Sequence, residues 1–299
     1  NIQKEVITMN KLMEWQSINS EVSGFLASLV AAGYNIFISG GTGSGKTTFL
    51  NALSQYIPKN ERIITIEDNA ELQIQNIKNL VRLEARNANV EGTGEVTIRD
   101  LIKSALRMRP DRIIVGEVRS AEAIDMLQAL NTGHDGSLST GHANSPKDMI
   151  SRLETMVLMG IDLPLPAIER QIASGLDIIV HLGRLRDKSR KVLEVTEVLG
   201  YWDGQIHLQT IYRYEEIRKE DENVTEKRIR KIKSMENGKK LRNFFTAKNL
   251  WQQDITFKER TKAGMKTAGM IGITAWLYYR RERCNTNLKG FIAYTEAAR

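Results

Sequence analysis

The sequence predicts an α/β fold with a mostly parallel central sheet covered by helices, followed by a C-terminal β-meander. Two observations support this prediction. Short apolar runs rich in strand-forming residues alternate with segments of helical periodicity, which is typical of a parallel sheet with helices on both faces. One such run, residues 35–39, leads through a glycine-rich loop into a helical segment. Because the chemistry of such sheets gathers at the carboxyl ends of the strands, residues there are the first candidates for function.

Capping residues place the helices. Ser20, Ser120 and Ser145 each stand before a segment with helical spacing of apolar residues, and Thr97-x-x-Asp100 has the form of a capping box. Residues 72–96 are expected to be irregular or short-stranded. Core strands are expected at residues 35–39, 62–66, 113–117 and 138–140. A further helix at residues 166–174 is followed by strands at 178–185, 192–199 and 205–212, which form the meander.

The glycine-rich loop fits the pattern G-x-x-x-x-G-K-[ST]. When a strand, this loop and a helix follow one another, backbone N–H groups can converge on phosphate oxygens. The alternative to a phosphate-binding loop is a glycine-rich turn that matches the pattern by chance. We expect Lys46 to reach the β- and γ-phosphates of a nucleoside triphosphate and the Thr47 hydroxyl to ligate Mg²⁺. The expected binding residues are Gly40, Gly41, Thr42, Gly43, Ser44, Gly45, Lys46, Thr47 and Thr48.

Acidic residues end two of the other strands. The strand at 113–117 ends in Gly-Glu, which makes Glu117 the candidate general base that activates the attacking water. Glu67 and Asp68 end the strand at 62–66 and are candidates to hold Mg²⁺, partly through water. The alternatives are an ordinary exposed acid for Glu117, and a helix cap or surface turn for Glu67 and Asp68.

Two histidines and four arginines complete the candidate site. His142 follows the strand at 138–140 and His134 precedes it; either could hydrogen-bond a γ-phosphate or only satisfy a loop carbonyl. Zinc is not expected, because no cysteine accompanies them. Arginines can stabilise transition-state charge from their own subunit or a neighbour's. The candidates are Arg62, Arg82, Arg86 and Arg119, of which Arg119 is placed nearest the chemistry by Glu117.

The charge is divided unevenly along the chain. The 299 residues carry a net charge of +7, yet residues 1–214 hold 23 Lys and Arg against 25 Asp and Glu. The basic excess therefore lies in residues 215–299, with 20 against 11. A near-neutral core speaks against a nucleic-acid track, so no nucleic-acid partner is expected.

Together these motifs resemble the Walker A, Asp-box, atypical Walker B and His-box set of the type II/type IV secretion ATPases. Within them the sequence looks most like the Tad/Flp pilus assembly ATPases of the CpaF type. The resemblance covers roughly residues 5–215, and the residues that carry it are 40–47, 64–68, 114–119 and 132–146.

The resemblance implies a RecA-like motor domain that binds ATP and Mg²⁺ in a homohexameric ring. It also implies a cytoplasmic protein, peripheral at the inner membrane, that works on the platform protein of a pilus or secretion system. Residues 1–33 would then be only the connection to an N-terminal domain that is mostly missing from this sequence, and the arginines of that domain would be absent. Without it, autonomous activity and ring assembly are in doubt.

Three domains are expected: the connection at 1–33, the motor at 34–214 and a basic tail at 215–299. Residues 215–262 are dense in charge and are interpreted as a solvated helix or a disordered linker. The apolar run at 265–279 is shorter than a membrane-spanning helix needs, and could be a span, an interfacial or partner-binding helix, or a poorly ordered appendage. A fused or read-through fragment would also explain this tail.

Three functions remain open at this point. The first is an ATP-hydrolysing motor for pilus assembly or protein secretion. The second is a nucleic-acid-stimulated translocase with the same fold, against which the neutral core speaks. The third is a structural subunit that binds nucleotide without turnover, against which the presence of Lys46, Thr47 and Glu117 speaks.

Overall fold

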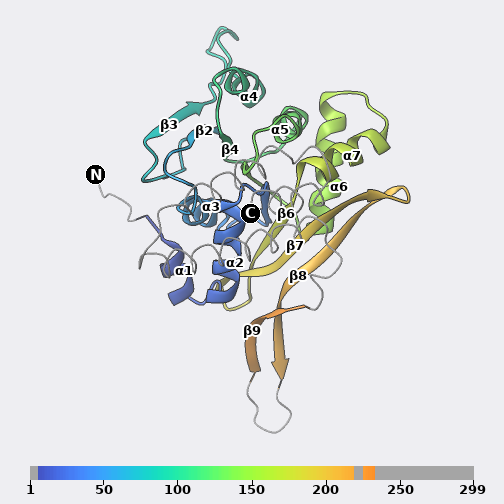
Figure 1. The fold of residues 1–299 in the computed structure, drawn as a ribbon. Helices are drawn as coiled ribbons and strands as arrows, with labels where there is room; N and C mark the ends of the chain where they lie inside the picture. Colours follow the sequence, from blue (N-terminus) through green and yellow to red (C-terminus); the bar gives the residue numbers. More distant parts are fainter. Residues whose placement is uncertain (1–5, 219–224, 233–299) are drawn as a thin grey trace, which may run out of the picture. The chain divides into compact units, whose positions relative to one another are not determined.

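The computed structural model describes residues 6–218 and 225–232. The described strands form one sheet (Figure 1). They are β1 (Ile36–Gly40), β2 (Arg62–Glu67), β3 (Asn79–Glu84), β4 (Arg112–Val115), β5 (Leu138–Gly141), β6 (Ile178–Arg184), β7 (Arg190–Trp202), β8 (Gln205–Arg218) and β9 (Thr225–Lys231). Their order across the sheet is β3-β2-β4-β5-β1-β6-β7-β8-β9.

The half of the sheet from β3 to β6 is parallel, as the alternation of strands and helices predicts. Residues on β1, β4 and β5 are buried along their whole length, which is typical of strands covered on both faces. Because side chains alternate along a strand, Phe37 faces one side of the sheet while Ile36 and Ile38 face the other.

The helices pack in two groups. They are α1 (Met9–Glu14), α2 (Ser20–Ala31), α3 (Lys46–Ser54), α4 (Ile98–Arg107), α5 (Glu122–Asn131), α6 (Pro146–Gly160) and α7 (Leu165–Gly175). Helices α1 and α2 pack on α3, which contacts β1 and β5. Helix α5 contacts α4, α6 and α7, and this second group encloses the main hydrophobic cluster together with Phe37 and Ile64. The parallel sheet is thus covered by helices on both faces.

Of the four helix caps predicted from the sequence, two are present in the structure and two are not. The capping box of Thr97 and Asp100 begins α4, and Ser145 caps α6. Helix α2 is capped by Asn19 in place of Ser20, because the Asn19 carboxamide accepts the Val22 amide at 2.9 Å.

Ser120 does not cap α5. The N-cap position is Ala121, which makes no side-chain cap hydrogen bond. The Glu122 carboxylate instead accepts the backbone amides of Arg119 and Ser120, at 2.6 and 2.9 Å. An acid in the first turn satisfies these donors better than a single hydroxyl would, and it also suits the helix dipole.

The meander is confirmed, and it extends further than predicted. Strands β6, β7 and β8 pair antiparallel, and β9 adds a fourth strand. Residues 215–218 and 225–231 are therefore strand, not the expected helix or linker. The register pairs Glu215 with Arg228 and brings Arg230 diagonally beside Glu215, 3.4 Å from its carboxylate, which removes part of the repulsion in this charge-dense segment. The rest of the expected tail, including the apolar run at 265–279, lies outside the described residues.

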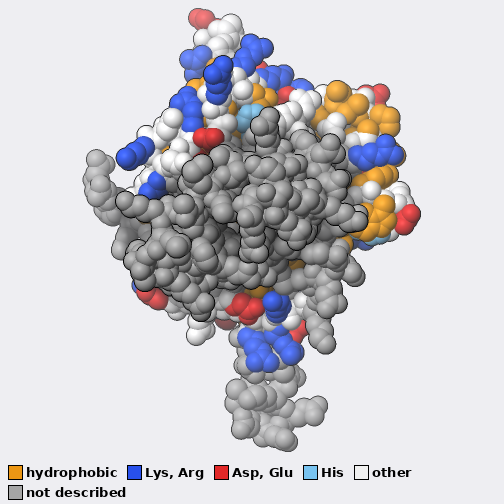
Figure 2. Space-filling model, viewed as in Figure 1, with side chains coloured by type: hydrophobic (Ala, Val, Ile, Leu, Met, Phe, Trp, Pro, Cys, Tyr) orange, Lys and Arg blue, Asp and Glu red, His pale blue; other side chains and the backbone are white. Residues whose placement is uncertain are grey.

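Two surface features stand out in the described part of the chain. Figure 2 shows hydrophobic side chains exposed over α6 and α7, and Lys and Arg gathered around α4. The exposed large hydrophobic residues from the end of α6 to the start of α7 are Leu158, Met159, Ile161 and Leu165. No helix among the described residues has the length and apolar character needed to cross a bilayer.

Candidate functional site

The phosphate loop joins β1 to α3, as predicted. Gly43 and Gly45 have left-handed backbone conformations, with φ of +71° and +94°, which favour glycine. Gly40 has no room for a side chain, because a Cβ there would lie 2.5 Å from the Leu182 carbonyl oxygen. The N-cap of α3, Gly45, offers no side-chain cap to the first amides of the helix. These amides are therefore available to an anion at the helix N-terminus.

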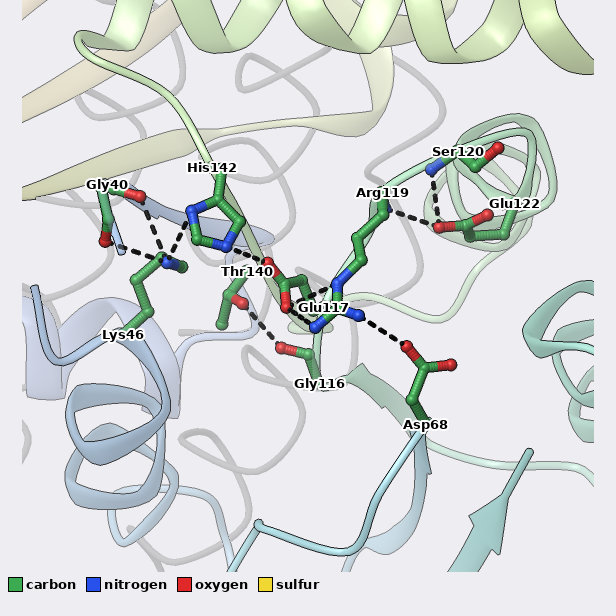
Figure 3. Close-up of polar contacts among 11 residues, drawn as sticks. Gly40, Lys46, Asp68, Gly116, Glu117, Arg119, Ser120, Glu122, Thr140 and His142 are labelled. Carbon is green, nitrogen blue, oxygen red and sulfur yellow. Dashed lines mark hydrogen bonds and ion pairs between the residues drawn. The ribbon is translucent and has the colours of Figure 1, made fainter. Parts of the chain in front are cut away.

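Lys46 begins α3 and is buried under the loop. Its ammonium group donates to the carbonyl oxygens of Gly40 and Gly41, at 3.2 and 3.3 Å, and lies 3.3 Å from Nδ1 of His142 (Figure 3). Burial lowers the pKa of Lys46, and the negative charge of Glu117 opposes that shift. A phosphate group at this loop would supply the negative charge that the lysine lacks.

His142 connects Lys46 to Glu117. Its Nε2 lies 2.7 Å from Oε1 of Glu117, and its other ring nitrogen faces the Lys46 ammonium. Burial lowers the pKa of His142, and the positive charge of Lys46 lowers it further. Because an ammonium can only donate, Nδ1 accepts, and the proton of the neutral ring sits on Nε2, facing the carboxylate.

Arg119 closes the other side of Glu117. Its Nε donates to Oε2 of Glu117 at 2.8 Å, its Nη2 contacts the same oxygen, and its Nη1 lies 3.2 Å from Asp68. Figure 3 shows the resulting chain of side chains from Lys46 through His142, Glu117 and Arg119 to Asp68. The structure thus brings together residues from the ends of β2, β4 and β5 and from the phosphate loop, as the sequence predicts.

Glu67 lies beside this chain, buried against the end of β4. Its Oε1 accepts the backbone amides of Glu71 and Leu72, at 3.0 and 2.8 Å. Burial raises the pKa of Glu67, and these two amides oppose the shift. A Cβ on Gly116 would lie 2.9 Å from Cγ of Glu67, so glycine is needed where β4 ends.

Four predicted residues lie elsewhere. Arg62 starts β2, and His134 precedes β5, so both are at the amino ends of their strands and away from the loop. Arg62 donates to the Met108 carbonyl at 3.0 Å. His134 lies 3.2 Å from the carbonyl oxygen of Ala129, which belongs to the last turn of α5 and not to a loop.

The other two, Arg82 and Arg86, belong to β3 and the segment after it. Arg82 donates to the Ile74 carbonyl at 3.4 Å, and Arg86 to the Gly94 carbonyl at 2.7 Å. Arg82 acts on the site through Glu67, because its positive charge opposes the rise in the pKa of Glu67 that burial causes. A role toward a neighbouring subunit stays a prediction.

The donor set fits Mg²⁺ bound mainly through substrate and water. Among the described residues, no group of three His, Cys, Asp or Glu side chains is placed to hold a metal ion. Mg²⁺ keeps several waters and commonly takes only one or two protein ligands together with substrate phosphates. The Thr47 hydroxyl at the start of α3 suits this role, while one oxygen each of Glu67 and Asp68 is engaged by backbone amides and by Arg119.

Two contacts of the site were missed from the sequence. Thr140 of β5 donates from its hydroxyl to the Gly116 carbonyl at 2.6 Å, which fixes the backbone beside Glu117. Arg190 of β7 donates from Nε to the Gly43 carbonyl at 2.8 Å. Thr140 stands at a predicted strand end, two residues before His142, and could have been noted. Arg190 lies 147 residues from Gly43 and gives no local signal.

Comparison with known proteins decides the family. Over residues 1–271, the sequence matches the family described as Type II/IV secretion system protein. The chain belongs to this family. The match continues past residue 215, where the predicted resemblance ends. The fold is the RecA-like fold of secretion ATPases, and the chain carries the ATPase domain of the family.

Individual relatives agree with this assignment. A putative conjugal transfer protein of Mycobacterium tuberculosis is 43% identical over 196 residues, covering 66% of this chain and 55% of that protein. The type IV secretion system protein PtlH of Bordetella pertussis is 40% identical over 185 residues, covering 60% and 53%. The crystal structure of the VirB11 ATPase from the Brucella suis type IV secretion system, in complex with sulphate, has a TM-score of 0.53 at 34% identity and covers 65% of this chain and 57% of that one. The chain spans about half the length of these curated relatives.

Proposed function

We propose that this chain is the ATP-hydrolysing motor of a machine that assembles a pilus or secretes protein. The observation that carries the proposal is the chain of contacts from Lys46 through His142 to Glu117, directly at the phosphate loop. It joins a phosphate-binding cation to a carboxylate at hydrogen-bonding distances. A structural subunit that binds nucleotide without turnover would need the loop but not this connection.

Binding is assigned to the loop and the start of α3. The backbone amides of residues 40–48 cradle the phosphates, and Lys46 exchanges its carbonyl partners for β- and γ-phosphate oxygens. Thr47 would hold Mg²⁺, with Glu67 and Asp68 contributing through water, and the ion would supply neutralisation of the charge that develops on the phosphates during hydrolysis.

Hydrolysis is assigned to Glu117. Its carboxylate takes a proton from the water that attacks the γ-phosphorus, and the bond to the β-phosphate oxygen breaks as ADP leaves. Arg119 holds one carboxylate oxygen by a hydrogen bond, and Nε2 of His142 lies 2.7 Å from the other, so the two side chains limit the directions in which Glu117 can face the water. His142, which also faces Lys46, is placed to respond when the γ-phosphate is lost.

Assembly and partners follow from the family and the predicted resemblance. We infer a homohexamer when the N-terminal domain is present, with the connection at 1–33, the motor at 34–214 and the remainder of the chain beyond. The expected partner is the platform protein of a pilus or secretion system, at the cytoplasmic side of the inner membrane. Within the family, the motifs favour a Tad/Flp pilus assembly motor of the CpaF type.

The phosphate loop is tested by Lys46→Ala. Loss of the buried ammonium removes the main positive charge facing the phosphates, so binding of ATP with Mg²⁺ should weaken by at least about tenfold and hydrolysis should disappear. Isothermal titration and phosphate release measure the two effects. Lys59→Ala, in the exposed turn that follows α3, is the matched control and should bind and hydrolyse as the unchanged protein does.

Wild-type binding and hydrolysis retained in Lys46→Ala would contradict the proposal. Stimulation of hydrolysis by single- or double-stranded DNA would instead favour the nucleic-acid translocase. The same phosphate-release measurement with and without DNA distinguishes the two machines.

A further inference from the structure

Arg190, the first residue of β7, reaches from the meander to the phosphate loop. Its Nε donates to the Gly43 carbonyl at 2.8 Å. Its Cδ lies 3.1 Å from the position that a Cβ on Gly45 would take, so the side chain covers the loop where α3 begins. No carboxylate of the described residues pairs with this guanidinium. The loop carbonyl is therefore its established partner, and its other N–H groups keep donor capacity.

The next two residues of β7 hold a different segment. The Lys191 ammonium donates to the Gln16 carbonyl at 2.8 Å and lies 3.4 Å from that of Trp15. The Val192 amide donates to the Ser17 carbonyl at 2.9 Å. Residues 15–17 form the turn between α1 and α2, in which Gln16 has a left-handed φ of 54°.

Three consecutive residues of one strand thus bind two segments that are separate in sequence. Residues 190–192 pair with residues 182–184 of β6, and β7 pairs with β8 from Glu194 onward. The backbone of residues 190–192 is therefore held by the sheet and cannot easily follow the movement of either segment alone. Displacement of the Gly43 carbonyl therefore acts on Arg190, and through the strand on the bonds made by Lys191 and Val192. A phosphate group bound within the loop adds negative charge near the guanidinium, and this charge competes with the Gly43 carbonyl for the donors of Arg190.

We propose that Arg190 is a positioning residue for the phosphate loop, and that Arg190–Val192 link the nucleotide state of the loop to the turn at residues 15–17. This inference rests on the proposed nucleotide binding. In this proposal the start of β7 positions the phosphate loop for binding. It also transmits the change that nucleotide binding makes in the loop to the segment before α2. That segment lies within residues 1–33, the expected connection to an N-terminal domain.

The test compares Arg190→Ala, Arg190→Lys and the control Arg186→Ala in the chain as it stands. Arg186 lies exposed in the turn of the same hairpin, away from the loop. Two quantities are measured: the dissociation constant and KM for ATP with Mg²⁺, and hydrogen exchange of the amides in residues 15–18 and of Val192, with and without nucleotide.

We expect the unchanged protein and Arg186→Ala to alter exchange in residues 15–18 when nucleotide binds. Arg190→Ala should raise the dissociation constant and KM by about tenfold with a smaller change in kcat, as loss of a charge-assisted hydrogen bond would. At saturating nucleotide it should still protect the phosphate loop but lose the response in residues 15–18. Arg190→Lys, which keeps one donor, should recover part of both effects, and it carries the test if the alanine variant does not fold.

Unchanged affinity and unchanged exchange in both Arg190 variants would overturn the inference. A nucleotide response in residues 15–18 that survives in Arg190→Ala would overturn the link. If the unchanged protein binds no nucleotide, the proposed function fails instead, so the two failures are distinguishable.

Discussion

His142 is placed between a cation and an anion. The Lys46 ammonium faces Nδ1, and the Glu117 carboxylate lies 2.7 Å from Nε2. A neutral ring can serve both neighbours at once, because it accepts on one side and presents its proton on the other. A protonated ring would bring a second positive charge against Lys46. The site is therefore arranged for a neutral imidazole.

This arrangement predicts how stability depends on pH. Burial, and then the charge of Lys46, lower the pKa of His142 below the ordinary 6.5. Between that lowered pKa and 6.5 the unfolded chain binds more protons at this position than the folded protein. The contribution of His142 to stability is thus complete above 6.5 and is lost as the pH falls through this window.

Urea unfolding of the unchanged protein and of His142→Gln measures this effect. Over about pH 5 to 7, the free energy of unfolding should fall more steeply with decreasing pH in the unchanged protein than in the variant. Parallel curves for the two proteins would show that His142 is not held neutral by its surroundings.

Single residues also show what the sequence could and could not reveal. Lys46, Glu117 and His142 were predictable, because each stands at the end of an apolar strand or inside a spaced glycine motif. Arg190 was not, because its partner Gly43 is 147 residues away and only the register of the meander brings them together. Arg62 differs, because it begins both the predicted strand at 62–66 and β2, so its distance from the carboxyl ends of the strands could have been inferred from the sequence.

At the scale of elements, the end of β4 shows how strand packing shapes the site. Gly116 allows Glu67 to lie against the backbone next to Glu117, and Thr140 of the neighbouring β5 fixes the Gly116 carbonyl. The Glu67 side chain can thereby be buried at the carboxyl ends of the strands without displacing Glu117. In the Gly-Glu sequence at this strand end, the glycine is required by the packing of Glu67 and the glutamate by the proposed chemistry.

Gly116→Ala tests this packing. The added Cβ would lie 2.9 Å from Cγ of Glu67, so Glu67 or the β4 backbone must move. We expect a loss of about 1–3 kcal/mol in the free energy of unfolding and a marked fall in hydrolysis. The matched control is Gly24→Ala on α2, where nothing lies within 4 Å of the new methyl group.

Because alanine favours helix, the control should leave stability unchanged or raise it by up to about 1 kcal/mol, with hydrolysis intact. Denaturant unfolding and phosphate release measure both variants. Equal behaviour of Gly116→Ala and Gly24→Ala would show that close packing of Glu67 is unimportant.

Elements were predictable where their signals are local. The capping box at Thr97 and the serine cap at Ser145 are contained within four residues of sequence, and both are present. Strand β9 was missed, because its dense charge resembles a linker and only pairing with β8 makes it a strand. The start of α5 was misplaced, since the Glu122 carboxylate, and not Ser120, satisfies the free amides.

At the scale of the whole molecule, the sheet gathers residues from the ends of three strands, β2, β4 and β5, and from the phosphate loop into one site. The order of β4, β5 and β1 places Glu117, His142 and Lys46 on neighbouring strands or directly after them. Membership in the Type II/IV secretion system family agrees with this arrangement. The alternation of strands and helices predicted the parallel half of the sheet, while the length of the meander depended on pairings that no local pattern reveals.

The central claim is that Glu117 activates water in a site that binds ATP. The most direct measurement is single-turnover hydrolysis of ATP with Mg²⁺ by the unchanged protein and by Glu117→Gln, alongside nucleotide affinity. Glutamine keeps the shape of the side chain but cannot take the proton, so affinity should change by less than about tenfold while the hydrolysis rate falls by about a hundredfold or more. Glu91→Gln, in an exposed loop, should match the unchanged protein. Hydrolysis retained in Glu117→Gln at the rate of the unchanged protein would contradict the account.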